Sequence, residues 1–352
     1  MTSSISSSAP KLNIIVIGGG LIGPRHASSI NTLPSAHLLA FIDPVSHGPL
    51  TASSLGTQHF PTLDALLNST TTAKPDAAII CAPNKTHVPI APELIAAGIH
   101  CLVEKPISTS IPEGLELIAA AREKGVKVLV GHHRRFNPYL LAAKKALDEN
   151  SLGQIVALQG TWCLRKAASY FNDVGEWRRG ESGGTILINL VHEVDLLQYL
   201  LGPITPVILK FQSGVVGTFV LSDAAPSPWN FEGGTGENPI IPRVEENFGA
   251  CGFYRIMSTR GSLSVPDLTK WTGDWDQVLK REQLDVEKEI VPFNEQMSHF
   301  VRVVRDGERP RCTAEEALSA LVVCEAIKEA MRAEMWVDVQ DFVVRLRDNG
   351  NE

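Results

Sequence analysis

Three glycines lie between an apolar segment and a segment of helical composition. Residues 14–17 read Ile-Ile-Val-Ile, and the glycines follow in the order Gly18-x-Gly20-x-x-Gly23. This spacing is typical of a dinucleotide-binding turn, in which the first glycine permits a tight turn, the second admits the pyrophosphate, and the third permits close helix packing. The free N–H groups of the helix N-terminus would accept the anion. The predicted cofactor contacts of this turn are Gly18, Gly20, Leu21, Ile22 and Gly23.

An acidic residue, Asp43, ends the next apolar segment at residues 38–42. A carboxylate at the tip of the second strand accepts hydrogen bonds from the adenosine ribose hydroxyls and repels a 2′-phosphate. Residues 44–50 contain no Arg or Lys that would pair with such a phosphate. The sequence therefore favours NAD over NADP as the cofactor. The alternative is that Asp43 only caps the turn before Pro44.

The elements that must position these residues alternate along the first third of the chain. Short apolar segments are separated by helical patterns up to about residue 130. This alternation predicts a parallel, doubly wound sheet. The expected strands are residues 13–17, 37–42, 77–81, 100–103 and 127–130, and the expected helices include 62–67, 88–97 and 111–124.

The pattern changes after Pro138, where longer alternating segments predict a mostly antiparallel open sheet with helices on one face. The fold class is therefore α/β, with an N-terminal Rossmann dinucleotide-binding domain and a C-terminal α+β domain. The predicted domains are a disordered tail at 1–10, an NAD-binding domain at 11–132, and a substrate and oligomerisation domain at 133–352. The expected strands here are 154–164, 208–222, 253–258 and 262–265, and the expected helices are 139–148 and 313–333.

Composition limits the classes of partner. The 352 residues exceed the size of about 250–300 residues at which one hydrophobic core stops growing. A formal net charge of −7 gives no general reason to expect nucleic acid or an anionic membrane. No segment reaches the roughly 18 consecutive apolar residues of a membrane helix, and the serine-rich start lacks a signal-peptide core. The six cysteines form no Cys-x-x-Cys pair, which indicates buried thiols of a cytoplasmic protein.

Three further segments carry polar side chains close to predicted strands. Residues 81–87 read Cys-Ala-Pro-Asn-Lys-Thr-His, and residues 103–106 read Val-Glu-Lys-Pro. Each follows or ends a parallel strand, where a doubly wound sheet binds its ligands. Residues 183–195 begin with Gly-Gly and include His192 and Asp195.

The motifs together resemble the Gfo/Idh/MocA family, which includes glucose-fructose oxidoreductase and inositol dehydrogenase. The resemblance spans nearly the whole chain and implies hydride transfer between a nicotinamide and a carbon that bears a hydroxyl or carbonyl, usually on a sugar or polyol. It also implies an open second sheet that supports a homo-oligomer, either a dimer or a tetramer. The motifs are Gly18-x-Gly20-x-x-Gly23-x-x-His26, Pro83-Asn84-x-x-His87, Ala97-Gly98-x-His100, Glu104-Lys105-Pro106, Arg134-Arg135-Phe136-Asn137-Pro138, and Gly183-Gly184 before His192-x-x-Asp195.

The resemblance assigns Lys105 a place beside the nicotinamide and the substrate hydroxyl, and makes His192 the acid/base. Both residue types suit the chemistry, since histidine titrates near neutral pH and an ammonium stabilises developing alkoxide charge. Alternatively, Lys105 is an exposed lysine paired with Glu104, and His192 is a packed helix histidine. The remaining predicted cofactor contacts are Ala82, Pro83, Asn84, His87, Glu104 and Lys105. The predicted substrate contacts are Lys105, Arg135, Asn189 and His192.

Two features depart from the family pattern. Ile188 stands four residues before His192, where the family has a carboxylate on the same helix face. The nearest polar substitute is Asn189, whose amide cannot take up a proton. The second departure is a shortening near Val207 and Ile208, where family members have an extra strand and connection.

Several other residues have two interpretations each. Arg135 could hold a substrate oxygen or form a structural salt bridge. The pair His132 and His133 suggests a metal, but neighbours on a strand face opposite ways, so no metal is predicted. Aromatic side chains in the second domain could stack on a sugar, although core packing is the better interpretation; these are Trp162, Tyr170 and Trp177.

The leading hypothesis is an NAD-dependent oxidoreductase that acts on a sugar, cyclitol or related polyhydroxy compound. One alternative keeps the cofactor and changes the small-molecule substrate to a hydroxy or keto acid, an enone or an imine. Another is a non-catalytic NAD(H)-binding sensor or subunit, which would bind cofactor without turnover. No nucleic-acid or membrane partner is expected.

Overall fold

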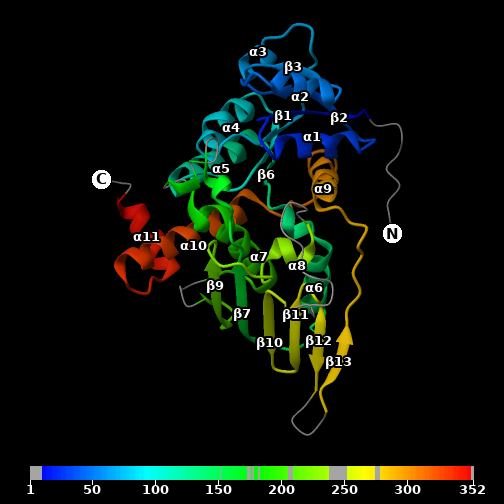
Figure 1. Ribbon diagram of the computed structural model, residues 1–352. Coiled ribbons are helices and arrows are strands. Elements are labelled where there is room, and N and C mark those ends of the chain that lie inside the picture. The colour runs from blue at the N-terminus through cyan, green and yellow to red at the C-terminus, as the bar shows by residue number, and fades with distance from the viewer. Residues whose placement is uncertain are drawn as a thin grey trace. The chain divides into compact units, whose positions relative to one another are not determined.

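The chain is described from a computed structural model that covers residues 10–150, 152–172, 176, 178–180, 183–204, 209–237, 252–273 and 278–349 (Figure 1). Two compact units are present. The first comprises the described residues of Met1–His133 and Val291–Leu318, and the second those of Arg134–Ile290 and Ser319–Glu352. The shortened segment near Val207 and Ile208 and residue Trp177 lie outside the described residues. No helix in the described ranges has the length and apolar character needed to cross a membrane.

The sheet of the first unit has six strands in the order β3-β2-β1-β4-β5-β6, and every neighbouring pair is parallel. The central strands are apolar and fully buried, as parallel strands are when both faces of the sheet are covered. The predicted doubly wound sheet is confirmed. The strands are β1 (Leu12–Ile17), β2 (Ala36–Ile42), β3 (Gln58–Phe60), β4 (Ala77–Ile80), β5 (His100–Val103) and β6 (Val128–Val130).

Local signals set the helix ends in this unit. The Ser110 hydroxyl accepts the N–H of Glu113 at 3.4 Å at the start of α5 (Ile111–Lys124), and Gly125 ends the helix with φ +66°. The predicted helix at residues 111–124 is therefore reproduced. The other helices are α1 (Gly23–Asn31), α2 (Gly48–Ser54), α3 (Leu63–Leu67), the 3₁₀ turn Asn84–Thr86, α4 (His87–Ala96) and α9 (Pro292–Asp306).

Helix α9 corrects one boundary drawn from the sequence, which assigns everything after residue 132 to the second domain. Its residues Met297, Phe300 and Val301 share one hydrophobic core with Ile14 of β1 and Ile30 of α1. The chain therefore returns to the first unit after the second sheet. The apolar face of α9 is visible in the sequence, but nothing local to the helix specifies which sheet it covers.

The sheet of the second unit has seven strands in the order β13-β12-β11-β10-β7-β9-β8. Its pairs are antiparallel except for β7 with β9, so the predicted mostly antiparallel sheet is confirmed. The strands are β7 (Ile155–Cys163), β8 (Leu209–Lys210), β9 (Val216–Ser222), β10 (Tyr254–Ser258), β11 (Gly261–Val265), β12 (Thr269–Thr272) and β13 (Lys280–Gln283).

The strand expected at residues 208–222 is interrupted, because a turn around Gly214, with φ +87°, separates β8 from β9. The last helix, α11 (Val339–Asn349), has no counterpart in the sequence-based prediction. The remaining helices are the 3₁₀ turn His133–Phe136, α6 (Pro138–Asp148), the 3₁₀ turn Ala168–Phe171, the π-helix Ile186–Leu190, α7 (Val191–Leu201), α8 (Phe231–Thr235) and α10 (Ala314–Ala333).

Candidate active site

Of the three motif glycines in the turn between β1 and α1, two are required by the chain's own packing and one is not. Gly18 has φ +106°, and a Cβ there would lie 2.7 Å from the carbonyl carbon of Cys81. A Cβ on Gly23 would lie 1.9 Å from the carbonyl oxygen of Gly18. On Gly20 it would meet nothing within 4 Å among the described residues. Packing therefore explains Gly18 and Gly23, whereas Gly20 leaves open space where a pyrophosphate would approach the backbone.

Asp43 follows β2 directly and fastens this turn. One carboxylate oxygen accepts the N–H of Gly19, and the other accepts the N–H of Val45 at 2.8 Å. Each oxygen has a further lone pair, so the group can also accept a ribose hydroxyl. The turn-cap interpretation is thus realised and is compatible with cofactor binding. Leu21, in the same turn, is 80% exposed and remains a predicted cofactor contact.

His87 joins the turn after β4 to the turn after β5. Its Nε2 lies 2.8 Å from the carbonyl oxygen of Ala82, and its Nδ1 lies 2.9 Å from that of Pro106. The ring is buried, with 1% of the residue exposed. His87 therefore holds Ala82 and its neighbours Pro83 and Asn84 in place, and we expect it to act on the cofactor through these turns.

Protonation decides how many of these contacts His87 makes. A neutral imidazole carries one N–H, so only the protonated ring can donate to both carbonyls. Burial lowers the pKa of His87 from its usual 6.5, and Lys105 acts in the same direction, although the two carbonyls and Glu104 oppose the shift. Near neutral pH the His87 ring therefore donates a hydrogen bond to only one of the two carbonyls.

Glu104 forms a buried pair with His26 of α1. Its Oε1 lies 2.7 Å from His26 Nε2, and its Oε2 accepts the backbone N–H of Lys105 at 3.2 Å. Burial alone would raise the pKa of Glu104, but the hydrogen bond and charge of His26, together with His133 and Lys105, lower it to about 2. A Cβ on Gly131 would lie 2.6 Å from Oε1, which explains the glycine there.

Lys105 is therefore held from both sides. Glu104 fixes its backbone N–H, and His87 contacts the carbonyl of the following Pro106. Lys105 is half-buried. The predicted cofactor contact Glu104 is engaged with His26 and with this backbone, so it positions Lys105. His26 is absent from the predicted site residues, although its place three residues after Gly23 in the glycine motif is a usable signal.

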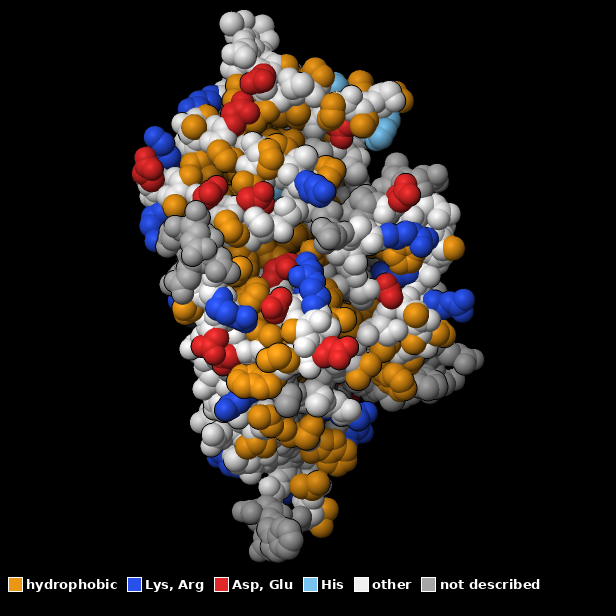
Figure 2. All heavy atoms as spheres, turned by 90° about the vertical axis from the view of Figure 1, so that its left-hand side faces the viewer, with side chains coloured by type: hydrophobic (Ala, Val, Ile, Leu, Met, Phe, Trp, Pro, Cys, Tyr) orange, Lys and Arg blue, Asp and Glu red, His pale blue; other side chains and the backbone are white. Residues whose placement is uncertain are grey.

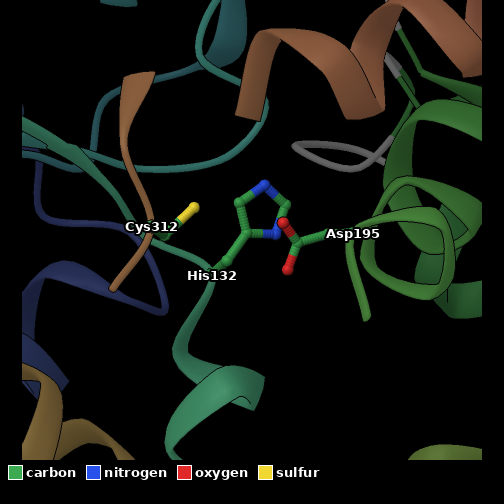
Figure 3. A group of neighbouring side chains, drawn as sticks. All are labelled: His132, Asp195 and Cys312. Atoms are coloured by element: carbon green, nitrogen blue, oxygen red, sulfur yellow. The ribbon is translucent and has the colours of Figure 1, made fainter. Parts of the chain in front are cut away.

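The two histidines after β6 have different surroundings. The His133 ring lies against Phe293 of α9, with ring centroids 4.4 Å apart, whereas a ring nitrogen of His132 lies within 4.8 Å of Cys312 Sγ (Figure 3). Figure 3 also draws Asp195, which α7 of the second unit carries. Closed structural metal sites use about four ligands. That this chain binds no metal remains a prediction.

In the second unit, His192 lies in the first turn of α7, directly after the π-helix Ile186–Leu190. The sequence pattern assumes an α-helix, in which Ile188 stands one turn before His192. A π-helix forms i→i+5 hydrogen bonds, so Leu187 also comes to stand one turn before it. Neither residue replaces the missing carboxylate, and Asn189, 6% exposed, is the nearest polar side chain that precedes His192 in the sequence.

Two neighbouring arginines hold the carboxylates of α7. Arg135 binds Asp195 in bidentate fashion, with Nε 3.0 Å from Oδ2 and Nη2 2.7 Å from Oδ1. Arg134 donates to Glu193 at 2.5 Å and to Glu232 at 2.9 Å. The salt-bridge interpretation of Arg135 is thus realised. To contact substrate as predicted, Arg135 would have to share or leave Asp195.

The carboxylate of Glu193 is the centre of this buried network. Burial raises its pKa to about 6, although Arg134 and the hydroxyl of Tyr254, which donates to Glu193, oppose the shift. Trp162 Nε1 donates to Glu232 at 2.8 Å, and Trp162 is fully buried, so it belongs to the core. The predicted site residues miss Glu193, Glu232 and Tyr254. The only local sequence signal for this network is the pair of carboxylates, Glu193 and Asp195, that follows His192.

Three family models match the chain in sequence. They are described as "Oxidoreductase family, NAD-binding Rossmann fold" over residues 12–132, "GFO/IDH/MocA C-terminal domain" over 140–209, and "Oxidoreductase family, C-terminal alpha/beta domain" over 205–339. The chain belongs to the Gfo/Idh/MocA oxidoreductase family. The resemblance drawn from the motifs is therefore confirmed.

Several known proteins are similar to this chain in sequence or in fold. The inositol 2-dehydrogenase of Rhizobium meliloti is 26% identical over 59% of this chain and 60% of that protein. A putative NADPH-dependent oxidoreductase of Desulfitobacterium hafniense has a TM-score of 0.78 at 20% identity, over 95% of this chain and 99% of that one. The WlbA dehydrogenase of Bordetella pertussis, in complex with NADH and UDP-GlcNAcA, has a TM-score of 0.73 at 20% identity, over 93% and 98%. These structures share the two-part fold.

Proposed function

We propose that this family member is an NAD-dependent oxidoreductase that transfers a hydride between the nicotinamide and a CH–OH or carbonyl carbon of a sugar, cyclitol or related polyhydroxy compound. The observation that carries the proposal is the turn after β1, where Gly20 leaves open space beside the carboxylate-fastened backbone of Gly19. The residues proposed to hold the cofactor are Gly18, Gly20, Leu21, Ile22, Gly23, Asp43, Ala82, Pro83, Asn84 and Lys105.

NAD is proposed over NADP on the basis of Asp43. Asp43 directly follows β2. From this position a carboxylate accepts hydrogen bonds from the ribose hydroxyls and repels a 2′-phosphate. Residues 44–50 supply no compensating cation. One similar structure is named as NADPH-dependent and another is a complex with NADH, so the proposed preference for NAD rests on the residues of this chain.

Lys105 and His192 are proposed to act on the substrate. Bound NAD supplies the hydride acceptor or donor. The Lys105 ammonium would stabilise negative charge on the reacting oxygen, and its backbone anchors restrict where it can point. His192 would take the hydroxyl proton during oxidation and return it during reduction. Asn189 would hold a substrate hydroxyl.

The substrate class follows the family and the named relatives. One relative is named for inositol and one structure contains a UDP-linked sugar acid, and both are polyhydroxy compounds. Ile188 removes a negative charge that the family pattern places before His192. The proposed substrates therefore include acidic members of this class.

The test is reduced-nicotinamide absorbance with NAD or NADP and a panel of polyols, sugars and hydroxy acids. We expect turnover with NAD that Lys105→Ala and His192→Ala each abolish, while the exposed control Lys145→Met retains it. Saturable NADH binding without turnover across the panel would contradict catalysis and favour a cofactor sensor.

We further propose that the chain forms a homo-oligomer through the exposed face of its second sheet. One row of cross-strand neighbours runs over five strands, and its members therefore share one face of the sheet. The row consists of Val216, Ala157, Met257, Ser262 and Trp271. Val216, Met257 and Trp271 are 37–45% exposed. Light scattering should report a dimer or tetramer that Met257→Arg dissociates; a wild-type monomer would contradict this.

On the face drawn in Figure 2, basic and acidic side chains are interspersed, and no nucleic-acid partner is proposed.

A further inference from the structure

Lys166 follows β7, and its ammonium lies over two aromatic rings. The Nζ atom is 5.3 Å from the ring centroid of Trp162 and 4.8 Å from that of Tyr170. The side chain is half-buried. No ion pair to Lys166 is present among the described residues. An ammonium that is partly withdrawn from water without a direct counter-ion lacks the partner that normally offsets its burial.

Two more cations lie on the same aromatic cluster. The guanidinium of Arg178 is 4.2 Å from the ring centroid of Tyr170 and donates to the Tyr170 carbonyl oxygen at 2.7 Å. Arg179 lies 4.9 Å from the ring centroid of Phe171, which contacts Tyr170 edge-on. Cation–π contacts favour these positions, so three cationic side chains gather on one aromatic cluster.

The carboxylates that act on Lys166 are engaged elsewhere. Burial lowers the pKa of Lys166, while Glu232 and Asp223 act against the shift and Arg134 and Arg178 add to it. Glu232 accepts from Arg134 and Trp162. Asp223 accepts from the hydroxyl of Thr185 at 2.5 Å. An anion that reached Lys166 would therefore meet an ammonium with no competing direct partner.

The cluster is tied to the helix that carries His192. The backbone N–H of Lys166 donates to the carbonyl oxygen of Asp223 at 3.0 Å, and the side chain of Asp223 binds Thr185. Thr185 immediately precedes the π-helix that runs into His192. A ligand group at Lys166 would thus be held by the same framework as the proposed acid/base.

We propose that Lys166 and Arg178 form a subsite for a substrate carboxylate, so that the substrate is a polyhydroxy acid such as an aldonic or uronic acid. The proposal rests on the proposed oxidoreductase function and narrows its substrate class. Charge-assisted hydrogen bonds from an ammonium and a guanidinium bind carboxylates strongly. Ile188 fits this substrate, because a carboxylate in its place would repel an acid.

The test compares matched acids and neutral compounds on the NADH-loaded protein by calorimetry. The pairs are D-glucuronate with D-glucose and D-gluconate with D-glucitol. We expect at least one acid to bind about tenfold or more tightly than its neutral partner, which corresponds to about 1.4 kcal/mol. Lys166→Met should remove this preference, whereas Lys166→Arg and the exposed control Lys145→Met should retain it.

Several outcomes would overturn the subsite. Equal affinity within both pairs, including no binding of either acid, contradicts it, as does a preference for acid that survives in Lys166→Met. Failure of the parent function is distinguishable, because it appears as absent NADH binding or absent turnover in the wild type. NADH binding with turnover of neutral sugars and no acid preference overturns the subsite alone.

Discussion

The two units hold their functional residues by different means. In the first unit the cofactor turn is shaped by glycines and backbone hydrogen bonds, and Lys105 is anchored through its backbone neighbours. In the second unit α7 is held by arginine–carboxylate pairs between residues distant in sequence, Arg134 with Glu193 and Arg135 with Asp195. Backbone-shaped sites leave a local sequence signature, whereas ion-pair networks are specified by long-range pairing. Substitutions in the two units should therefore differ in their effects on stability and on cofactor affinity.

The largest expected effect is on the second unit. Asp195→Ala should lower the free energy of unfolding by about 3–5 kcal/mol, because it removes the carboxylate that the buried Arg135 guanidinium binds. Urea denaturation measures the loss. The control Asp148→Ala breaks a surface pair in which Asp148 is exposed and Lys144 half-buried, and it should cost no more than about 1 kcal/mol. Similar losses in both variants would contradict the importance of the buried pair.

The Glu104–His26 pair predicts a pH dependence in the first unit. The pKa of Glu104 falls from 4.5 to about 2 on folding, so the carboxylate stabilises the folded state above pH 4.5. This stability, about 3 kcal/mol, is lost as the pH falls from 4.5 towards 2. Urea titrations across this range should show a shallower pH slope for Glu104→Gln than for the wild type. Identical slopes would sink this assignment.

Smaller effects should distinguish the glycines of the cofactor turn. Gly23→Ala places a Cβ against the backbone oxygen of Gly18 and should cost about 1–3 kcal/mol of stability. Gly20→Ala meets open space, so its stability should change by no more than about 0.5 kcal/mol. NADH affinity should nevertheless fall in Gly20→Ala, since the methyl group occupies the approach of the pyrophosphate. An unchanged affinity would mean that the cofactor does not approach there.

Much of the first unit could be predicted from sequence. Fully apolar strand segments, the Ser110 cap and the glycine spacing act over a few residues, and the structure reproduces the elements they predict. The role of Glu104 could not be predicted, because His26 reaches it across 78 residues of sequence. The placement of α9 in the first unit depends on packing in the same way.

Less of the second unit could be predicted from the sequence. His192 and Asp195 stand out as a motif, but the partners of the α7 carboxylates lie as far away as Tyr254. The sequence does not indicate the π-helix before His192 either, since its apolar residues are compatible with an α-helix. Such features depend on tertiary context, which overrides local propensity.

The central claim is that the first unit is a site for NAD, and titration of NADH and NADPH into the wild-type protein, followed by reduced-nicotinamide fluorescence, tests it most directly. We predict saturable NADH binding and at least about tenfold weaker NADPH binding, because the Asp43 carboxylate would repel the 2′-phosphate. Absence of saturable NADH binding, or NADPH binding as tight as that of NADH, would contradict the account.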